Sequence, residues 1–167
     1  NRPTDCQRTS ENIMDTIEQV TANTVQKGMR VQKSFVSVTP YAPGRRSFFK
    51  YRDLGLEAAT GGRMRAYQNS SIVGMTEPTG WHYHICEMQF VYVLKGELTI
   101  EFEDGTVGTF KAGDAFFVPG GVRHNEIYVS EDKEALEVSV PGKIETVNCE
   151  RPAHLPEKLR AVSNENP

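Results

Sequence analysis

The stretch TGWHYHICEMQFVYVLKGE, residues 79–97, places two histidines one residue apart in a segment rich in aromatic and β-branched residues. His82 and His84 hold alternate positions, and alternate side chains of a strand point to the same face of its sheet. Two imidazoles on one face can bind the same divalent transition metal ion when a neighbouring strand supplies further ligands. Alone the pair is weak evidence, because same-face histidines also occur on polar surfaces and in hydrogen-bonded core pairs.

The chain around this stretch consists of short β-rich runs. Turns that contain glycine or acidic residues separate these runs about every 8–12 residues, which predicts an all-β sandwich or barrel. Residues 31–38 alternate like a strand, and residues 63–73 read as another. Two successive hairpins are predicted, with Lys95-Gly96 and Asp104-Gly105 at their tips.

A helical period appears only before the strands, over residues 10–27. Ser10 can cap the start of this helix, and Gly28 can end it. We expect its apolar stripe to pack on the barrel or on a partner subunit. The stripe consists of Ile13, Met14, Ile17, Val20 and Val25.

Three segments are predicted: an N-terminal arm and helix over residues 1–29, a β-barrel over residues 30–145, and a surface arm over residues 146–167. A short helix is expected near residues 156–162. The N-terminal helix and the exposed edge strands of the barrel need cover, so we expect a homodimer.

Composition excludes several classes of function. The chain has 167 residues, which suits one domain, and its net charge of −3 leaves no basic excess for binding nucleic acid. The longest apolar run is Phe90–Leu94, far below the ~20 residues of a membrane-spanning helix. No secretory signal pattern is visible, so we expect a cytoplasmic protein that does not bind membranes. The three cysteines, Cys6, Cys86 and Cys149, have no CxxC spacing and are expected as reduced thiols.

A third histidine follows a second group of turn residues. In GDAFFVPGGVRH, residues 113–124, the Pro-Gly-Gly turn redirects the chain and His124 begins the next run. His124 is therefore the natural third ligand of a metal site with His82 and His84.

The spacing of these two segments resembles the two conserved motifs of the cupin superfamily. In the first, His82-x-His84 is followed by four residues, Gln89, six residues and Gly96. In the second, Gly113 is followed by five residues, Pro119-x-Gly121, two residues and His124. The resemblance implies an all-β fold, the cupin double-stranded β-helix or jelly-roll barrel, here with an N-terminal α-helix.

Three positions depart from the cupin pattern. Thr76 stands where the leading glycine is expected, and Tyr128 replaces the last asparagine. Gln89 stands at the position of the usual glutamate ligand. A glutamine can offer its carbonyl oxygen to a metal, but it supplies no negative charge and cannot act as a base. The resemblance thus implies one divalent transition metal (Fe, Ni, Mn, Cu or Zn) held by His82, His84, His124 and Gln89.

The resemblance implies first a dioxygenase that acts on an enol, a β-diketone or a hydroxy acid. The alternative in the same pocket is a zinc-type Lewis-acid cyclase, isomerase or lyase. A third interpretation is a small-ligand-binding cupin without catalysis, in which protein atoms fill every metal position. In each case the expected partner is a small molecule.

Further pocket candidates follow from strand parity. Arg65 and Tyr67 share one face of their strand, and Arg65 can bind a substrate carboxylate. Met64, Ala66 and Gln68 share the other face, and parity does not decide which face points inward. Glu126 and Tyr128 share the parity of His124, so either can enter the pocket. Cys86 is expected as an inert thiol at the pocket edge, and His154 as a surface residue.

Overall fold

The computed structural model describes residues 27–162 and is almost entirely β. The helix predicted over residues 10–27, its apolar stripe and Cys6 therefore lie outside the described residues, apart from Lys27. The single helix of the described part is one turn, α2 (Leu56–Ala59). No helix within residues 27–162 is long and apolar enough to span a membrane.

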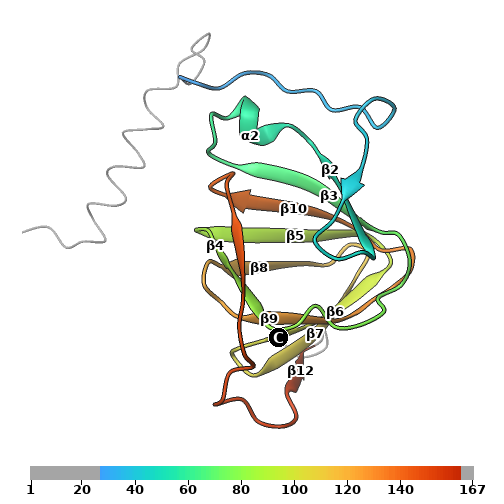
Figure 1. Ribbon diagram of the computed structural model, residues 1–167, viewed down its shortest axis with the longest axis vertical. Coiled ribbons are helices and arrows are strands. Elements are labelled where there is room, and N and C mark those ends of the chain that lie inside the picture. Colours follow the sequence, from blue (N-terminus) through green and yellow to red (C-terminus); the bar gives the residue numbers. More distant parts are fainter. Residues whose placement is uncertain (1–26, 163–167) are drawn as a thin grey trace, which may run out of the picture.

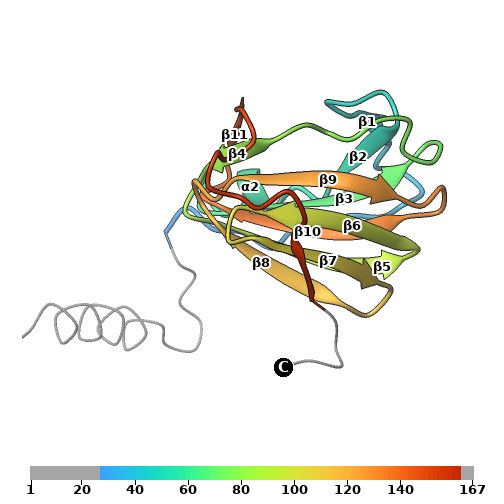
Figure 2. The same ribbon diagram turned by 90° about the horizontal axis from the view of Figure 1, so that it is seen from below.

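Two six-stranded sheets face each other as the layers of a flattened barrel (Figures 1 and 2). The first sheet has the order β1 (Ala42–Pro43), β2 (Phe49–Asp53), β3 (Arg65–Ser71), β10 (Glu134–Val140), β5 (Met88–Lys95) and β8 (Ala115–Pro119). The second has the order β11 (Glu145–Asn148), β4 (His82–Ile85), β9 (His124–Val129), β6 (Glu97–Phe102), β7 (Thr106–Lys111) and β12 (Arg160–Val162). The all-β jelly-roll barrel expected from the sequence is confirmed.

An apolar core closes one end of the barrel between the two sheets. Val93 of β5 lies against Leu98 and Ile100 of β6 and Val129 of β9, each at most 2% exposed. Phe48 and Phe49 from the start of β2 complete this cluster. The core thus fills the end of the barrel away from the β4–β9 pairing, and it leaves the interior near the histidines to polar side chains.

Gly96 carries the chain from one sheet to the other. The predicted hairpin at Lys95-Gly96 is wrong, because β5 pairs with β10 and β8, whereas β6 pairs with β7 and β9. Gly96 has φ 67°, and a Cβ there would clash with Ser130 Oγ. The hairpin predicted at Asp104-Gly105 is confirmed, since β6 and β7 pair up to Glu101 and Val107.

The strand predicted over residues 31–38 is also wrong. Val31 is 84% exposed and Phe35 is 60% exposed, and the segment pairs with no other described strand. Its end is a turn in which the N–H groups of Val38 and Thr39 both donate to Phe35 O. Alternation indicates which side chains would share a face, but it does not supply a partner strand.

The segment after residue 145, predicted as a surface arm, returns to the second sheet. β11 pairs with β4, and β12 pairs in parallel with β7. Between them, Leu155 and Leu159 pack on Trp81. The short helix predicted near residues 156–162 is wrong, because Arg160–Val162 forms β12 and the preceding residues are not helical.

Candidate metal centre and pocket

His82, His84 and His124 converge inside the barrel. The first two lie on β4 and the third begins β9, where His82 and His124 are register partners. One ring nitrogen from each residue lies within 4.8 Å of the other two, a spacing at which the three can hold one metal ion. His82 and His124 are buried, and His84 is half-buried.

Two glycines hold the strands of the histidines at this separation. Gly120 N donates to Glu87 O at 2.9 Å, and Gly121 N donates to His84 O at 2.9 Å. A Cβ on Gly120 would collide with the carbonyl oxygen of Cys86. The Pro-Gly-Gly turn before β9 therefore docks directly on the end of β4, an approach that a residue with a side chain at position 120 would prevent.

Hydrogen bonds fix the orientation of each imidazole ring. Nδ1 of His82 lies 2.7 Å from Gly80 O, and Nδ1 of His124 lies 3.0 Å from Val122 O. Because a carbonyl oxygen can only accept, each Nδ1 carries the proton and each Nε2 keeps its lone pair. Nδ1 of His84 lies 3.0 Å from Thr146 Oγ1, on β11. Metal-binding histidines typically hold this kind of partner on their second nitrogen.

The three rings are neutral at physiological pH. Burial, followed by repulsion from His124, lowers the pKa of His82 to about 4. Burial and repulsion from the other two histidines lower the pKa of His84 to about 3. Burial also lowers the pKa of His124. Neutral imidazole is the form that binds transition metals, so no proton competes with a metal at pH 7.

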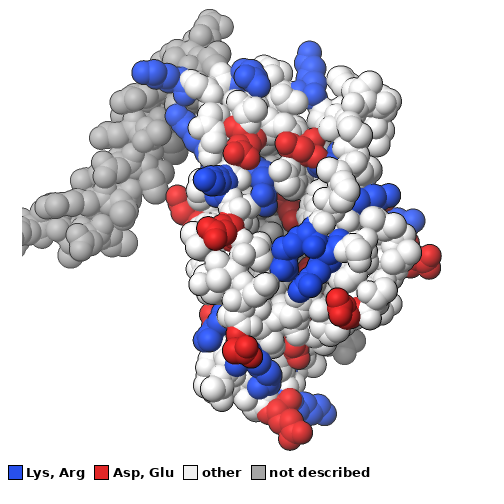
Figure 3. Space-filling view, in the orientation of Figure 1, with Lys and Arg blue, Asp and Glu red and all other residues white. Residues whose placement is uncertain are grey.

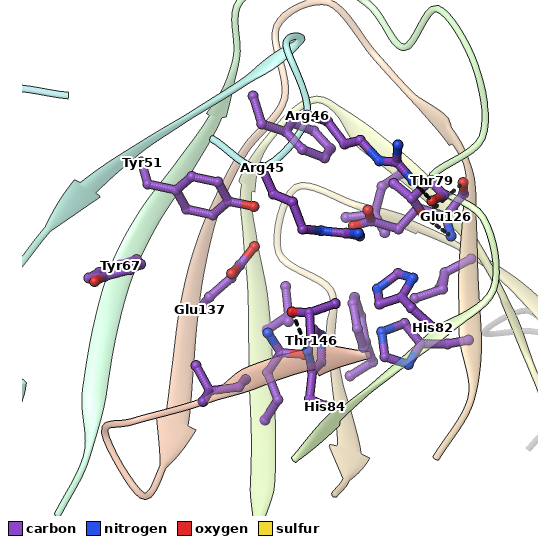
Figure 4. Close-up of a pocket in the computed structure, with 18 of the residues that line it drawn as sticks. Arg45, Arg46, Tyr51, Tyr67, Thr79, His82, His84, Glu126, Glu137 and Thr146 are labelled. Carbon is purple, nitrogen blue, oxygen red and sulfur yellow. Dashed lines mark hydrogen bonds between the residues drawn. The ribbon is translucent and has the colours of Figure 1, made fainter. Parts of the chain in front are cut away.

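The histidines form one wall of a cavity of about 220 Å³ between the two sheets (Figure 4). Arg45 and Arg46 reach it from the β1–β2 turn, and Arg65 and Tyr67 reach it from β3. Figure 3 shows basic side chains gathered near the centre of one face, beside a hollow in which acidic side chains are visible. A cavity of this size accepts a small molecule.

The arginines of this pocket have no carboxylate partner in the described part of the chain. Arg45 Nη1 donates to Asn148 Oδ1 at 3.1 Å, Arg46 Nη2 donates to Thr79 O, and the Arg65 guanidinium lies 4.5 Å from the centroid of the Tyr67 ring. Arg46 Nε is buried without any partner. Burial and the neighbouring Arg46 lower the pKa of Arg45. These cations favour an anionic ligand.

Most of the residues expected in the pocket line it. Gln89, 8% exposed on β5, belongs to the lining, as do Arg65 and Tyr67. Arg65 and Tyr67 therefore form the inward face of β3 near the site. Cys86 is absent from the lining, and burial raises the pKa of its thiol. His154 is exposed and lies 2.9 Å from Glu103 O through Nε2.

Tyr128 does not line the pocket, contrary to its parity with His124. It is 47% exposed, whereas Glu126 lines the cavity. The pairing of β6 with β9 shifts between Thr99 and Ile100, which face Tyr128 and Glu126 respectively. Ile127 is thus the extra residue of a β-bulge, and a bulge reverses the faces of the residues beyond it.

Several pocket residues were not predicted from the sequence. On β10 the apolar residues Leu136 and Val138 are of the type expected on the inward face. Ala135, Glu137 and Ser139 point inward instead. The remaining unpredicted members include Lys133, Tyr51, Thr79, Thr146, Arg45 and Arg46. No local sequence signal marks them, because the barrel interior here is polar and the usual parity argument selects the apolar face.

Lys133 is a buried cation at the end of the cavity near the apolar core. It is 1% exposed, and its Nζ lies 4.9 Å from the centroid of the Phe49 ring. Burial lowers the pKa of Lys133, while the nearby Glu137 and Glu126 oppose that shift. Burial also raises the pKa of Tyr51, and Glu137 adds to the effect. Tyr51 is therefore a neutral hydrogen-bond donor in this pocket.

Comparisons with known proteins agree with the jelly-roll fold of this chain. The family model described as Cupin domain matches residues 73–140. The chain superimposes on an RmlC-like cupin from Shewanella frigidimarina with a TM-score of 0.53 and 21% identity, over 70% of this chain and 96% of that one. It superimposes on the polyketide cyclase RemF from Streptomyces resistomycificus with a TM-score of 0.56 and 17% identity, over 73% and 89% of the two chains. Identities this low show a shared fold alone.

A curated relative matches only a short segment. The uncharacterized protein YdbB of Bacillus subtilis is 39% identical over 44 residues, which are 26% of this chain and 39% of that protein. The chain thus matches well under half the length of this relative. The barrel, the Cupin-domain match over residues 73–140 and the structural neighbours agree on the class: this chain has the cupin fold.

Proposed function

We propose that this chain is a metal-dependent enzyme that acts on a small anionic substrate with a carbonyl or enol group. His82, His84 and His124 hold one divalent transition metal, and Gln89 is a weaker fourth ligand through its side-chain oxygen. The observation that carries this proposal is the arrangement of the three rings, each tied through Nδ1 to an oxygen so that Nε2 is left for a metal.

The chemistry of the donor set fits such an ion. Three neutral imidazoles suit zinc, copper, iron and nickel, and the additional amide oxygen adds no charge. A metal bound there keeps its full positive charge and supplies Lewis-acid stabilisation to a substrate oxygen. The residues of the chain then have two tasks, which are to hold the substrate in place and to move its protons.

The arginines indicate the charge of the substrate. Arg45 and Arg46 reach the pocket from the β1–β2 turn, and neither is paired with a carboxylate among residues 27–162. A guanidinium pairs well with a carboxylate in a two-bond geometry. We therefore assign them the carboxylate of the substrate, with its carbonyl turned toward the histidines.

Redox-neutral chemistry, such as isomerisation, cyclisation or lyase cleavage, fits the pocket best. Proton-transferring groups, Glu126, Glu137 and Tyr51, line the same cavity as the histidines. The polyketide cyclase RemF, which shares the fold, gives a precedent for ring closure in a barrel of this kind.

Dioxygenase chemistry is the second candidate, and the same neutral donor set is compatible with it. The donor set of the three histidines and Gln89 contains no carboxylate, so an enolate substrate would meet an ion whose charge is not already reduced. The two candidates differ in their need for oxygen, because zinc cannot carry out redox chemistry with O₂.

Metal identification followed by assays with and without air distinguishes these functions. The probes are acetylacetone and pyruvate, with O₂ uptake recorded by an electrode and products recorded by NMR. Conversion or proton exchange under argon supports redox-neutral chemistry. Stoichiometric O₂ uptake with bound iron, nickel, manganese or copper supports the dioxygenase. Bound metal without any conversion or exchange would contradict both and leave a binding protein.

A further inference from the structure

The wall that faces the histidines carries a carboxylate in a position suited to proton transfer. Glu137 lies on β10, in the first sheet, whereas His82, His84 and His124 lie on strands of the second sheet. Figure 4 shows its carboxylate directed into the cavity that the histidines border. A small substrate in this cavity therefore lies between a metal site and a carboxylate.

One hydrogen bond fixes Glu137 and leaves half of its carboxylate free. Asn69 Nδ2, in a residue that is 1% exposed, donates to Glu137 Oε1 at 2.5 Å. No residue of the described part donates to Oε2. The hydroxyl of Tyr51 is turned toward the carboxylate in Figure 4. Glu137 is thus oriented by a buried amide, and its second oxygen is available to a ligand.

The cross-strand register places Glu137 diagonally across from Gln89 on the neighbouring strand. Ser139 of β10 is the register partner of Gln89 on β5, and Glu137 is the partner of Val91. Glu137 and Ser139 are two residues apart and share the inward face. Gln89 cannot take up a proton because its side chain is an amide. Glu137 therefore offers, one strand away, the base that position 89 lacks.

The cavity that Glu137 lines also contains basic side chains. Lys133 is buried in the same cavity, and Arg45 and Arg65 belong to its lining. These cations attract an anionic substrate into the cavity that Glu137 lines. Glu126 is the other carboxylate among the described residues that line the cavity. It lies on β9, two residues after the candidate metal ligand His124.

We propose that Glu137 is the general base of this site and removes the proton from the carbon next to the substrate carbonyl. This inference rests on the proposed metal-dependent function. The proton passes to Glu137 Oε2. The electrons of the C–H bond form a C=C bond, while the carbonyl π electrons move to oxygen and give an enolate. The proton on Glu137 Oε2 exchanges with solvent, and transfer of a solvent-derived proton from Oε2 back to carbon completes the exchange without any oxidant.

Proton exchange of pyruvate in D₂O tests the base directly. Metal-loaded protein should replace the methyl protons of pyruvate by deuterium faster than the same metal concentration alone, as followed by ¹H NMR. Glu137→Gln should slow this exchange by about 100-fold, within the usual range for loss of a general base. Glu134→Gln is the matched control on the same strand. Glu134 Oε2 accepts a hydrogen bond from Gln68 Nε2 at 2.8 Å, and Glu134 does not line the pocket. It should exchange at the wild-type rate.

Oxalate binding supplies a second readout that does not depend on turnover. Oxalate is a planar dianion that resembles an enolate but has no proton to give, so an ionised Glu137 repels it. Glu137→Gln should therefore bind oxalate about 10-fold more tightly than wild type by calorimetry, at equal metal content. A purely structural role for Glu137 predicts equal or weaker binding.

The outcomes distinguish a failure of the role of Glu137 from a failure of the proposed metal-dependent function. Two results would overturn the role of Glu137 without contradicting the metal site. One is a Glu137→Gln variant that exchanges pyruvate protons at the wild-type rate, and the other is a variant that binds oxalate no more tightly than wild type does. Wild-type protein that holds metal but neither binds nor exchanges pyruvate would also overturn it. Failure of the wild-type protein to retain any metal would overturn the proposed function, and this inference with it.

Discussion

His82 of β4 and His124 of β9 are register partners, and their ring centroids lie 4.4 Å apart. The ring of His84 lies 5.3 Å from the first and 5.1 Å from the second. Two of the three rings therefore come from paired strands, and the third comes from the same face of β4. Because all three lie on strands rather than on loops, the geometry of the site is set before any ligand binds.

The first prediction concerns Thr146, which holds the ring of His84. Thr146→Val keeps the shape of the side chain and removes the hydroxyl that lies 3.0 Å from His84 Nδ1. Loss of such a partner typically weakens metal affinity by about 10–100-fold. Competition with a chelator measures the effect. Thr99→Val, which removes one hydroxyl of the exposed Thr99–Thr109 pair on the outer surface, should leave the affinity unchanged.

The second prediction concerns the pH dependence of stability without metal. The folded protein holds the pKa of His82 at about 4 and that of His84 at about 3, below the ordinary value of 6.5. Between the folded pKa values and 6.5, the unfolded chain binds more protons than the folded chain does. The free energy of unfolding therefore rises with pH through this window and levels off above pH 6.5.

Acidification from pH 7 to 4.5 should therefore lower the free energy of unfolding, by an amount on the order of 2 kcal/mol for His82 alone. Urea unfolding at a series of pH values measures this loss. A double variant with His82→Gln and His84→Gln should have a flatter profile. An equally steep profile in that variant would show that other groups cause the pH dependence.

The third prediction concerns the charge of the substrate. Arg45→Gln removes a cation from the pocket without removing a bond to a carboxylate of the protein. The affinity of the metal-loaded protein for pyruvate should fall by about 10-fold, the effect of losing one charge-assisted hydrogen bond. Arg160→Gln, in the exposed strand β12, should bind pyruvate as wild type does. Equal affinities in the two variants would exclude Arg45 from substrate binding.

The fourth prediction concerns the crossing between the sheets. Gly96 and Gly105 both have positive φ, 67° and 86°, but only at Gly96 would a Cβ meet neighbouring atoms, among them Lys133 Cα at 2.9 Å. Gly96→Ala should destabilise the protein by at least about 1 kcal/mol more than Gly105→Ala does. Thermal unfolding of the two variants compares them, and similar melting temperatures would argue against close packing at the crossing.

The two spaced motifs were sufficient to predict the fold and the meeting of three histidines. They succeed because close contacts between backbone segments require glycine at fixed positions, and the spacing of these glycines can be read in the sequence. Gly121, for example, donates its N–H to His84 O of β4 and has φ 82°, a conformation that favours glycine. A short segment in which several positions require particular residues therefore predicts the local backbone geometry.

The rest of the pocket could not be predicted because its determinants are not local. Tyr128 was expected inside, but the bulge at Ile127 depends on how β9 pairs with β6. Glu137 carries no local signal for the pocket, because the alternating apolar residues Leu136 and Val138 are typical of the opposite inward face. Parity identifies residues that share a face, whereas the identity of the inward face depends on which strands come together.

Metal analysis of untagged wild-type protein is the most direct test of the central claim. The account predicts close to one divalent transition metal ion per chain, as in other sites of this type. His84→Ala should lose this metal, whereas His154→Ala should keep it, because His154 is exposed and its ring nitrogen Nε2 lies 2.9 Å from Glu103 O, away from the pocket lining. Wild-type protein that retains no metal after reconstitution, or His84→Ala that keeps a full complement, would contradict the account.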